Sequence, residues 1–195
     1  MSKHSCGLFT PCLLAVVAIA PRAAAAGEPN PVIAIRVENA RGLDGVNLLK
    51  AQQITTEIYE RAGVTLDWTS ENRTPGRSLT IVLTTIATAP AGINPESMGV
   101  APSPGDGTRG TTAYIFMDRV MSFVATHRVA GEYVLACALA HEIGHLLLPP
   151  NAHSADGIMR GSWHPSLFPP AAPGVPGFPP EQARLLRLRS QSRPH

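Results

Sequence analysis

The stretch HEIGHLLLPPNAHSADGIM, residues 141–159, joins the end of an apolar segment to a polar loop through two consecutive prolines. Apolar residues at helical spacing predict a helix over residues 131–147, with His141 and His145 one turn apart on the same face. Because proline lacks a backbone N–H and its ring clashes with the preceding turn, Pro149-Pro150 ends this helix and turns the chain back. The loop that follows therefore returns to the face that carries the two histidines.

The spacing His-Glu-x-x-His has a chemical reason, since two histidines one helical turn apart can bind the same Zn²⁺ ion. Glu142, beside them, is placed to take a proton from an activated water and pass it to a leaving amine. A catalytic zinc also needs a third protein ligand and an open fourth position. His153 in the returning loop is the favoured third ligand, and Asp156 and His164 are its rivals. The stretch predicts one catalytic Zn²⁺ ion.

These residues resemble the metzincin clan of zinc peptidases, especially its small bacterial matrixin-like members. In that clan a glycine and the third histidine occupy the positions of Leu148 and Asn151 in this chain. His153 lies two residues further on, so we interpret the loop as lengthened, with the Pro-Pro turn in place of the glycine turn. The clan also places a methionine in a tight turn beneath the zinc, and Met159 in Gly-Ile-Met matches it. The resemblance implies a zinc endopeptidase acting on peptides or proteins, with Glu142 as its general base.

The residues before the histidine motif predict a sheet and a helix packed on it. Alternating apolar residues predict a half-buried strand at 31–40, and helical spacing predicts an amphipathic helix at 46–62 with Gly63 as its C-terminal cap. Further strands are expected at 64–68, 78–87 and 112–117, with at most one short strand at 98–101. With the resemblance, this order predicts an α+β (α/β-like) fold: a metzincin-like mixed twisted sheet, a backing helix and an active-site helix. We expect residues 112–117 to form an edge strand that pairs with an extended substrate.

The C-terminal part is rich in proline, glycine and alanine, above all at residues 168–180, which cannot form a regular strand ladder. A short helix is expected near residues 118–126, and another at 181–189 that begins after Pro180. The arginines of this last helix alternate with leucines, which indicates a docked amphipathic helix with a solvated face. We expect residues 27–195 to form a single metallopeptidase-like domain, and a monomer.

Residues 1–26 have the pattern of a secretory signal peptide, with a basic start, a short apolar run and the small residues 23–26. The apolar run is too short to span a bilayer, so we expect no membrane span, cleavage near Ala26 and a secreted or periplasmic protein. Cleavage would remove Lys3 and Arg22 and lower the formal net charge from +2 to zero, which leaves no footprint for nucleic acid.

Cys137 would be the only cysteine left after cleavage, so no intramolecular disulfide can form. It lies one turn before His141, and we expect a buried structural cysteine because three ligands on successive turns of one helix do not suit a tetrahedral site. No cysteine between Ala26 and the first strand could cap the zinc, so we expect no latency by that route.

Some features also have simpler interpretations. Without a metal, Met159 would be an ordinary core residue, and Trp163 is only a candidate for a substrate pocket because aromatic residues after a turn often cover the core. Two other functions also fit the sequence. One is a catalytically inactive metal-binding protein of the cell envelope, against which Glu142 argues; the other is a zinc-dependent hydrolase of non-peptide amides.

Overall fold

The structure is a computed structural model that describes residues 30–39, 47–68, 77–84, 93–94, 96–103, 110–168 and 174–191. Its elements, in chain order, are β1 (Val32–Asn39), α1 (Leu48–Arg61), β2 (Thr65–Asp67), β3 (Arg77–Thr84), β4 (Gly99–Val100), β5 (Thr112–Phe116), α2 (Met117–His127), α3 (Gly131–Leu147), the 3-10 turn η2 (Pro165–Leu167) and α4 (Pro180–Gln191). The predicted α+β fold is confirmed. The predicted signal peptide lies outside the described residues.

The five strands form one sheet in the order β2-β1-β3-β5-β4. The first four of these run parallel, and β4 pairs antiparallel with β5, Gly99 opposite Ile115 and Val100 opposite Tyr114. The prediction that residues 112–117 form an edge strand is therefore wrong, because β5 is paired on both sides. The edge strand is the very short β4, which lies in the loop rich in proline and glycine.

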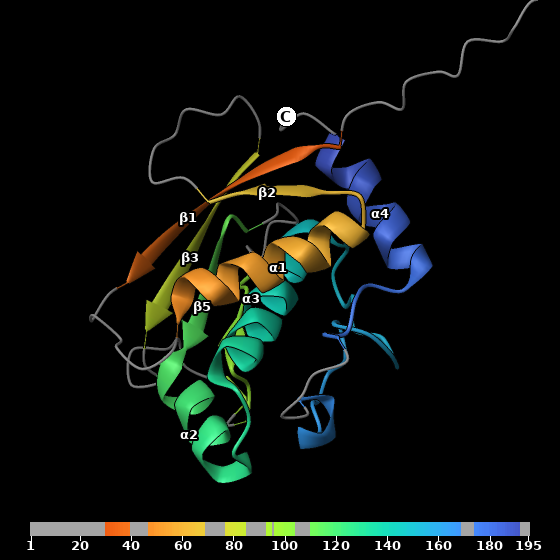
Figure 1. The fold of residues 1–195 in the computed structure, drawn as a ribbon. Helices are drawn as coiled ribbons and strands as arrows, with labels where there is room; N and C mark the ends of the chain where they lie inside the picture. The colour runs from red at the N-terminus through yellow and green to blue at the C-terminus, as the bar shows by residue number, and fades with distance from the viewer. Residues whose placement is uncertain are drawn as a thin grey trace, which may run out of the picture.

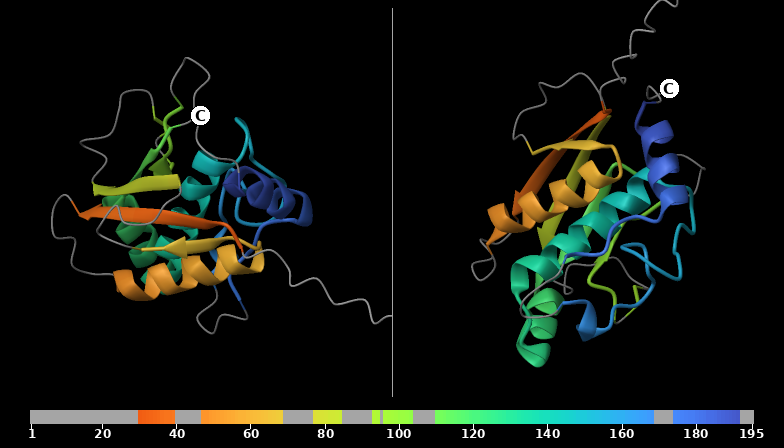
Figure 2. Two further views of the ribbon diagram at one scale, coloured as in Figure 1. Left: turned by 90° about the horizontal axis from the view of Figure 1, so that it is seen from above. Right: turned by 45° about the vertical axis from the view of Figure 1, so that its right-hand side comes forward.

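Helices α1 and α3 pack against the same face of the sheet (Figures 1 and 2). In α1 the buried residues recur at helical spacing, as an amphipathic helix on a sheet requires. The strands contribute alternate side chains to the core beneath the helices: Ile33, Ile35, Leu79, Ile81, Leu83, Ala113 and Ile115. Helix α3 is buried on nearly all sides from Val134 to Leu147, and within the motif only His141 and His145 are partly exposed.

The ends of α1 are well capped. At its start the side chain of Asn47 accepts the N–H of Lys50 at 3.0 Å. At its end Gly63 has a φ of +78°, its N–H donates to the carbonyl of Glu60, and the N–H of Val64 donates to that of Tyr59. The predicted glycine cap is confirmed, and it turns the chain directly into β2.

The C-terminal helix α4 docks beside the end of α1 (Figure 1). Ala183 and Leu186 are buried, and the Arg187 Nη1 donates to the carbonyl of Ala62 at 2.9 Å. The predicted amphipathic closing helix is confirmed. None of the described helices is long and apolar enough to cross a membrane.

Candidate metal centre

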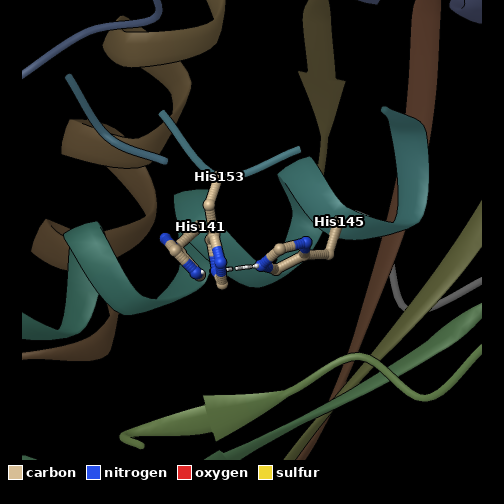
Figure 3. Close-up of side chains that lie close together, drawn as sticks. All are labelled: His141, His145 and His153. Carbon is tan, nitrogen blue, oxygen red and sulfur yellow. Dashed lines mark hydrogen bonds between the residues drawn. The ribbon is translucent and has the colours of Figure 1, made fainter. Parts of the chain in front are cut away.

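Three histidine side chains converge beside the last turns of α3 (Figure 3). His141 and His145 project from the helix and His153 from the returning loop, and their nearest ring nitrogens all lie within 4.8 Å of one another. The Nε2 atom of His145 is 3.0 Å from that of His141 and 3.2 Å from that of His153. Two nitrogens bound to one tetrahedral zinc ion are about 3.3–3.4 Å apart. The three side chains could therefore hold one metal ion.

The ring of His141 is oriented by a hydrogen bond to the turn that contains Met159. Its Nδ1 atom lies 2.9 Å from the carbonyl oxygen of Ile158, which can only accept a hydrogen bond. Nδ1 therefore carries the proton, and Nε2 presents a lone pair toward the other two histidines. Orientation of a metal-binding histidine through its second nitrogen is the usual arrangement in metal sites.

Burial makes these imidazoles hard to protonate. The pKa of His141 is lowered by burial and by the nearby His153, although the bond to Ile158 opposes this. Burial, with repulsion from His141 and His153, lowers the pKa of His145 to about 4. Because metal ligands must be unprotonated, these two rings are ready to bind a cation at neutral pH.

The side chain of Glu142 projects from α3 toward the edge strand β4. Only 6% of the residue is exposed, and burial raises the pKa of its carboxyl to about 8. Gly99 of β4 lies directly against it, since a Cβ at Gly99 would come within 2.8 Å of Glu142 Cγ and 3.0 Å of its Oε1. The sequence analysis did not identify Gly99, although a glycine within a short strand often marks such a close approach.

Met159 is fully buried beneath the helix. Its Sδ atom lies beside Gly144, where a Cβ would come within 2.5 Å of the sulfur. The structure thus places the methionine under the turn of α3 that carries two of the histidines. The sequence analysis predicted Met159 at this place but not its partner Gly144.

The loop after α3 brings His153 to the cluster and leaves Asn151 outside it. Leu148 has an extended backbone after α3, and Asn151 has a left-handed φ of 58°, a conformation that asparagine tolerates well. The rival ligands are also outside the cluster. Asp156 is exposed, and His164 caps the turn η2 by accepting the N–H of Ser166 at 3.3 Å.

The cluster opens onto a cavity of about 590 Å³. Glu142, His141 and His153 line it from one side. Trp163 stands in its wall with its ring edge-on to His141, 5.5 Å between ring centres, as expected for a pocket residue. The remaining walls come from Phe123 and His127 of α2, from Ala138 of α3, from the residues that lead into β4 and from residues 160–162 beside Trp163.

Cys137 does not join this site. It is fully buried in the core, and burial raises the pKa of its thiol to about 12, which keeps it protonated and unreactive. The cluster of three histidines does not include it. Its predicted place in the core is confirmed.

Comparison of the chain with models of known protein families and with curated protein sequences found no match. The similarity to metzincins therefore rests on the histidine motif and on the methionine turn. A function has to be inferred from the geometry of the site itself.

Proposed function

We propose that the protein is a zinc-dependent endopeptidase of the metzincin type. The observation that carries this proposal is the convergence of three imidazoles, two of which line a cavity that Glu142 also lines. Three protein ligands with an open side are typical of catalytic zinc sites, whereas structural sites have four protein ligands. A structural site also needs no neighbouring base, so Glu142 favours catalysis over simple metal storage.

In the proposed reaction Glu142 moves the protons. When bound, zinc would polarise the substrate carbonyl and lower the pKa of a water molecule. Glu142 accepts a proton from the attacking water and delivers it to the leaving nitrogen. Burial alone sets the pKa of this carboxyl at about 8, and a cation beside it favours the carboxylate. The cation would thus oppose the effect of burial, and the carboxylate is the form that accepts a proton from water.

The edge strand β4 favours a peptide as the substrate. In the described part of the chain no strand pairs with its outer edge, and Met98 and Gly99 line the cavity. An extended peptide can add to such an edge through main-chain hydrogen bonds. A peptide paired with β4 would cross the cavity in front of the histidines. A small amide is too short to form these main-chain hydrogen bonds with β4, so this edge favours a peptide.

The direct test is hydrolysis of a mixed peptide library and of small amides by the purified protein. We expect peptide cleavage that is lost on removal of the metal with a chelator and restored by Zn²⁺. Glu142→Gln keeps the shape of the side chain but removes its basicity, so we expect full zinc content and a rate lower by about 10²- to 10⁴-fold.

Each contrary result has a clear meaning. Cleavage of small amides alone would indicate a non-peptide amide hydrolase. A protein that binds zinc but hydrolyses neither class would be a binding protein. Undiminished hydrolysis by the Glu142→Gln variant would refute the role of Glu142.

The proposed place of action is outside the cytoplasm. Residues 1–26 have the composition of a secretory signal peptide. Sequencing the N-terminus of the protein recovered from its host would test this, and a first residue near Gly27 is expected. A mature protein that still begins at Met1 would contradict it.

A further inference from the structure

The loop that carries His153 depends on contacts from outside itself. Within the loop, the N–H of Ser154 donates to the carbonyl of Met159 at 3.0 Å, and the hydroxyl of Ser154 donates to that of Asp156 at 2.6 Å. His153 itself is exposed, unlike the two ligands on α3. Its position is therefore set by how firmly its backbone is held.

The C-terminal segment, residues 174–191, supplies this support at two points. The N–H of Ile158 donates to the carbonyl of Gly177 at 2.9 Å. The side-chain amide of Gln182 donates through Nε2 to the carbonyl of Ala152 at 2.8 Å. One bond thus holds the turn that orients His141, and the other holds the residue immediately before His153.

The C-terminal segment is itself fixed to the body of the protein. Arg61 donates through Nη2 to the carbonyl of Val175 at 3.1 Å, and the rings of Tyr59 and Phe178 meet with centres 5.0 Å apart. Arg187 holds α4 against the end of α1. The support on the loop therefore comes from the sheet-and-helix body rather than from a free tail.

A glutamine at position 182 is unfavourable if the side chain serves only to pack against its neighbours. It is half-buried, and its Oε1 atom is buried with no hydrogen-bond partner among the described residues. Burying an unpaired amide oxygen costs free energy, which an apolar side chain at this position would avoid. The bond from Nε2 to Ala152 is the one favourable polar contact that the structure records for this side chain.

We propose that Gln182 is a positioning residue for the third metal ligand: by holding the carbonyl of Ala152, it fixes the backbone from which His153 reaches the metal. The inference rests on the proposed metal site and extends it to a residue of α4. Partners that orient ligands in this way typically change metal affinity by about 10- to 100-fold when removed.

The test is the zinc dissociation constant, measured by competition with a chelator of known affinity. Gln182→Met keeps the length of the side chain and removes the donor, and we expect zinc binding about 10- to 100-fold weaker. Arg184→Met on the same helix is the matched control. Arg184 is exposed and pairs with Glu181, so zinc affinity should stay unchanged.

Thermal unfolding with and without zinc separates positioning from packing. A packing role would lower the melting temperature of both forms equally and leave the zinc dissociation constant unchanged, which would overturn the proposal. Positioning instead shrinks the gain in melting temperature that zinc provides. If Gln182→Met does not fold, Gln182→Glu serves, since it replaces the donor with an acceptor and should weaken zinc binding at least as much.

The variant His153→Ala keeps the two proposals distinct. If it retains full zinc, the proposed metal site itself fails. If it loses zinc while Gln182→Met binds as tightly as the parent protein, only the positioning role fails.

Discussion

At the residue scale, the place of the proposed base depends on a neighbour without a side chain. A Cβ at Gly99 would meet the side chain of Glu142 and also lie 2.7 Å from the backbone oxygen of Tyr114. The second contact is with the backbone of β5, which cannot rotate away. Either Glu142 or the strand would have to shift.

We therefore predict that Gly99→Ala displaces Glu142 while leaving the three histidines intact. Zinc content should stay at the parent level, and peptide hydrolysis should fall by about 10-fold or more, because general-base catalysis requires hydrogen-bond geometry. Gly177→Ala is the matched control, since an added Cβ there meets no atom closer than 3.9 Å. Parent-level hydrolysis by Gly99→Ala would show that the contact with Glu142 does not matter.

The loop between α3 and Met159 gives a second prediction at this scale. His153→Ala should lose most of its zinc after extensive dialysis, because two histidines leave the ion under-coordinated. Asn151→Gly removes a side chain of the same loop that lies outside the histidine cluster and keeps the left-handed backbone, so it should retain zinc. Metal analysis of both dialysed variants decides between them, and full zinc in His153→Ala would refute the site of three histidines.

The sequence predicts the side chains that could bind a metal or move a proton. It does not predict the groups that hold those side chains in position. The motif spacing predicts His141, Glu142 and His145, whereas His153 and Met159 are predicted from the returning loop and the Gly-Ile-Met turn; the structure brings the three histidines together, and the role of Glu142 stays a prediction. The supports are the carbonyl of Ile158, the space above Gly99 and the amide of Gln182. These groups act through backbone atoms or contact residues that are far away in the sequence. The spacing of neighbouring residues therefore does not predict such contacts.

At the element scale, polar side chains of α1 connect it to the helix that carries the histidines. Tyr59 is fully buried, and its hydroxyl donates to the carbonyl of Ala140 at 2.9 Å. Thr55 also lies within reach of α3, with its hydroxyl 3.3 Å from the carbonyl of Ala136. The two helices are therefore fixed in register as well as packed.

We predict that Tyr59→Phe lowers the free energy of unfolding by about 0.5–1.5 kcal/mol, the usual net value of one hydrogen bond. Tyr133→Phe is the control, because Tyr133 lies on α3 but is only partly buried. Urea denaturation of the two variants measures the difference. Equal stabilities would mean that the bond to Ala140 contributes nothing.

The same scale shows why most elements could be predicted and the pairing of one, the short strand expected at 98–101, could not. Long periodic segments predicted α1, α3, β1 and β3, because burial on one face repeats along them. The edge of the sheet was misplaced because β4 has two residues, too few to show any period. Its pairing with β5 comes from tertiary contacts.

At the scale of the whole molecule, the fold places a carboxyl where its charge is costly without a metal. Glu142 has a pKa of about 8 in the folded chain, above its ordinary value of 4.5. Between these two values the folded state holds a proton that the unfolded state has released. Stability of the metal-free protein from this group is therefore present at low pH and lost as pH rises toward 8.

The histidines act in the opposite direction over a lower range. The pKa of His145 falls from 6.5 to about 4 on folding, so the unfolded state binds the extra proton between these values and stability rises with pH there. The unfolded imidazole is still half protonated at pH 6.5, so this gain continues to about pH 7.5 and offsets a small part of the loss from Glu142.

We therefore predict that the metal-free protein loses about 1–2 kcal/mol of unfolding free energy between pH 6.5 and pH 8. The zinc-loaded protein should show no such loss, because the cation favours the carboxylate and compensates its burial. Glu142→Gln cannot ionise, so its metal-free form should show no fall in stability over this range. Urea denaturation at several pH values, with chelator or with zinc, measures all three curves. A metal-free parent whose stability does not fall, or one that falls as steeply in Glu142→Gln, would show that the burial of Glu142 does not control the response of the fold to pH.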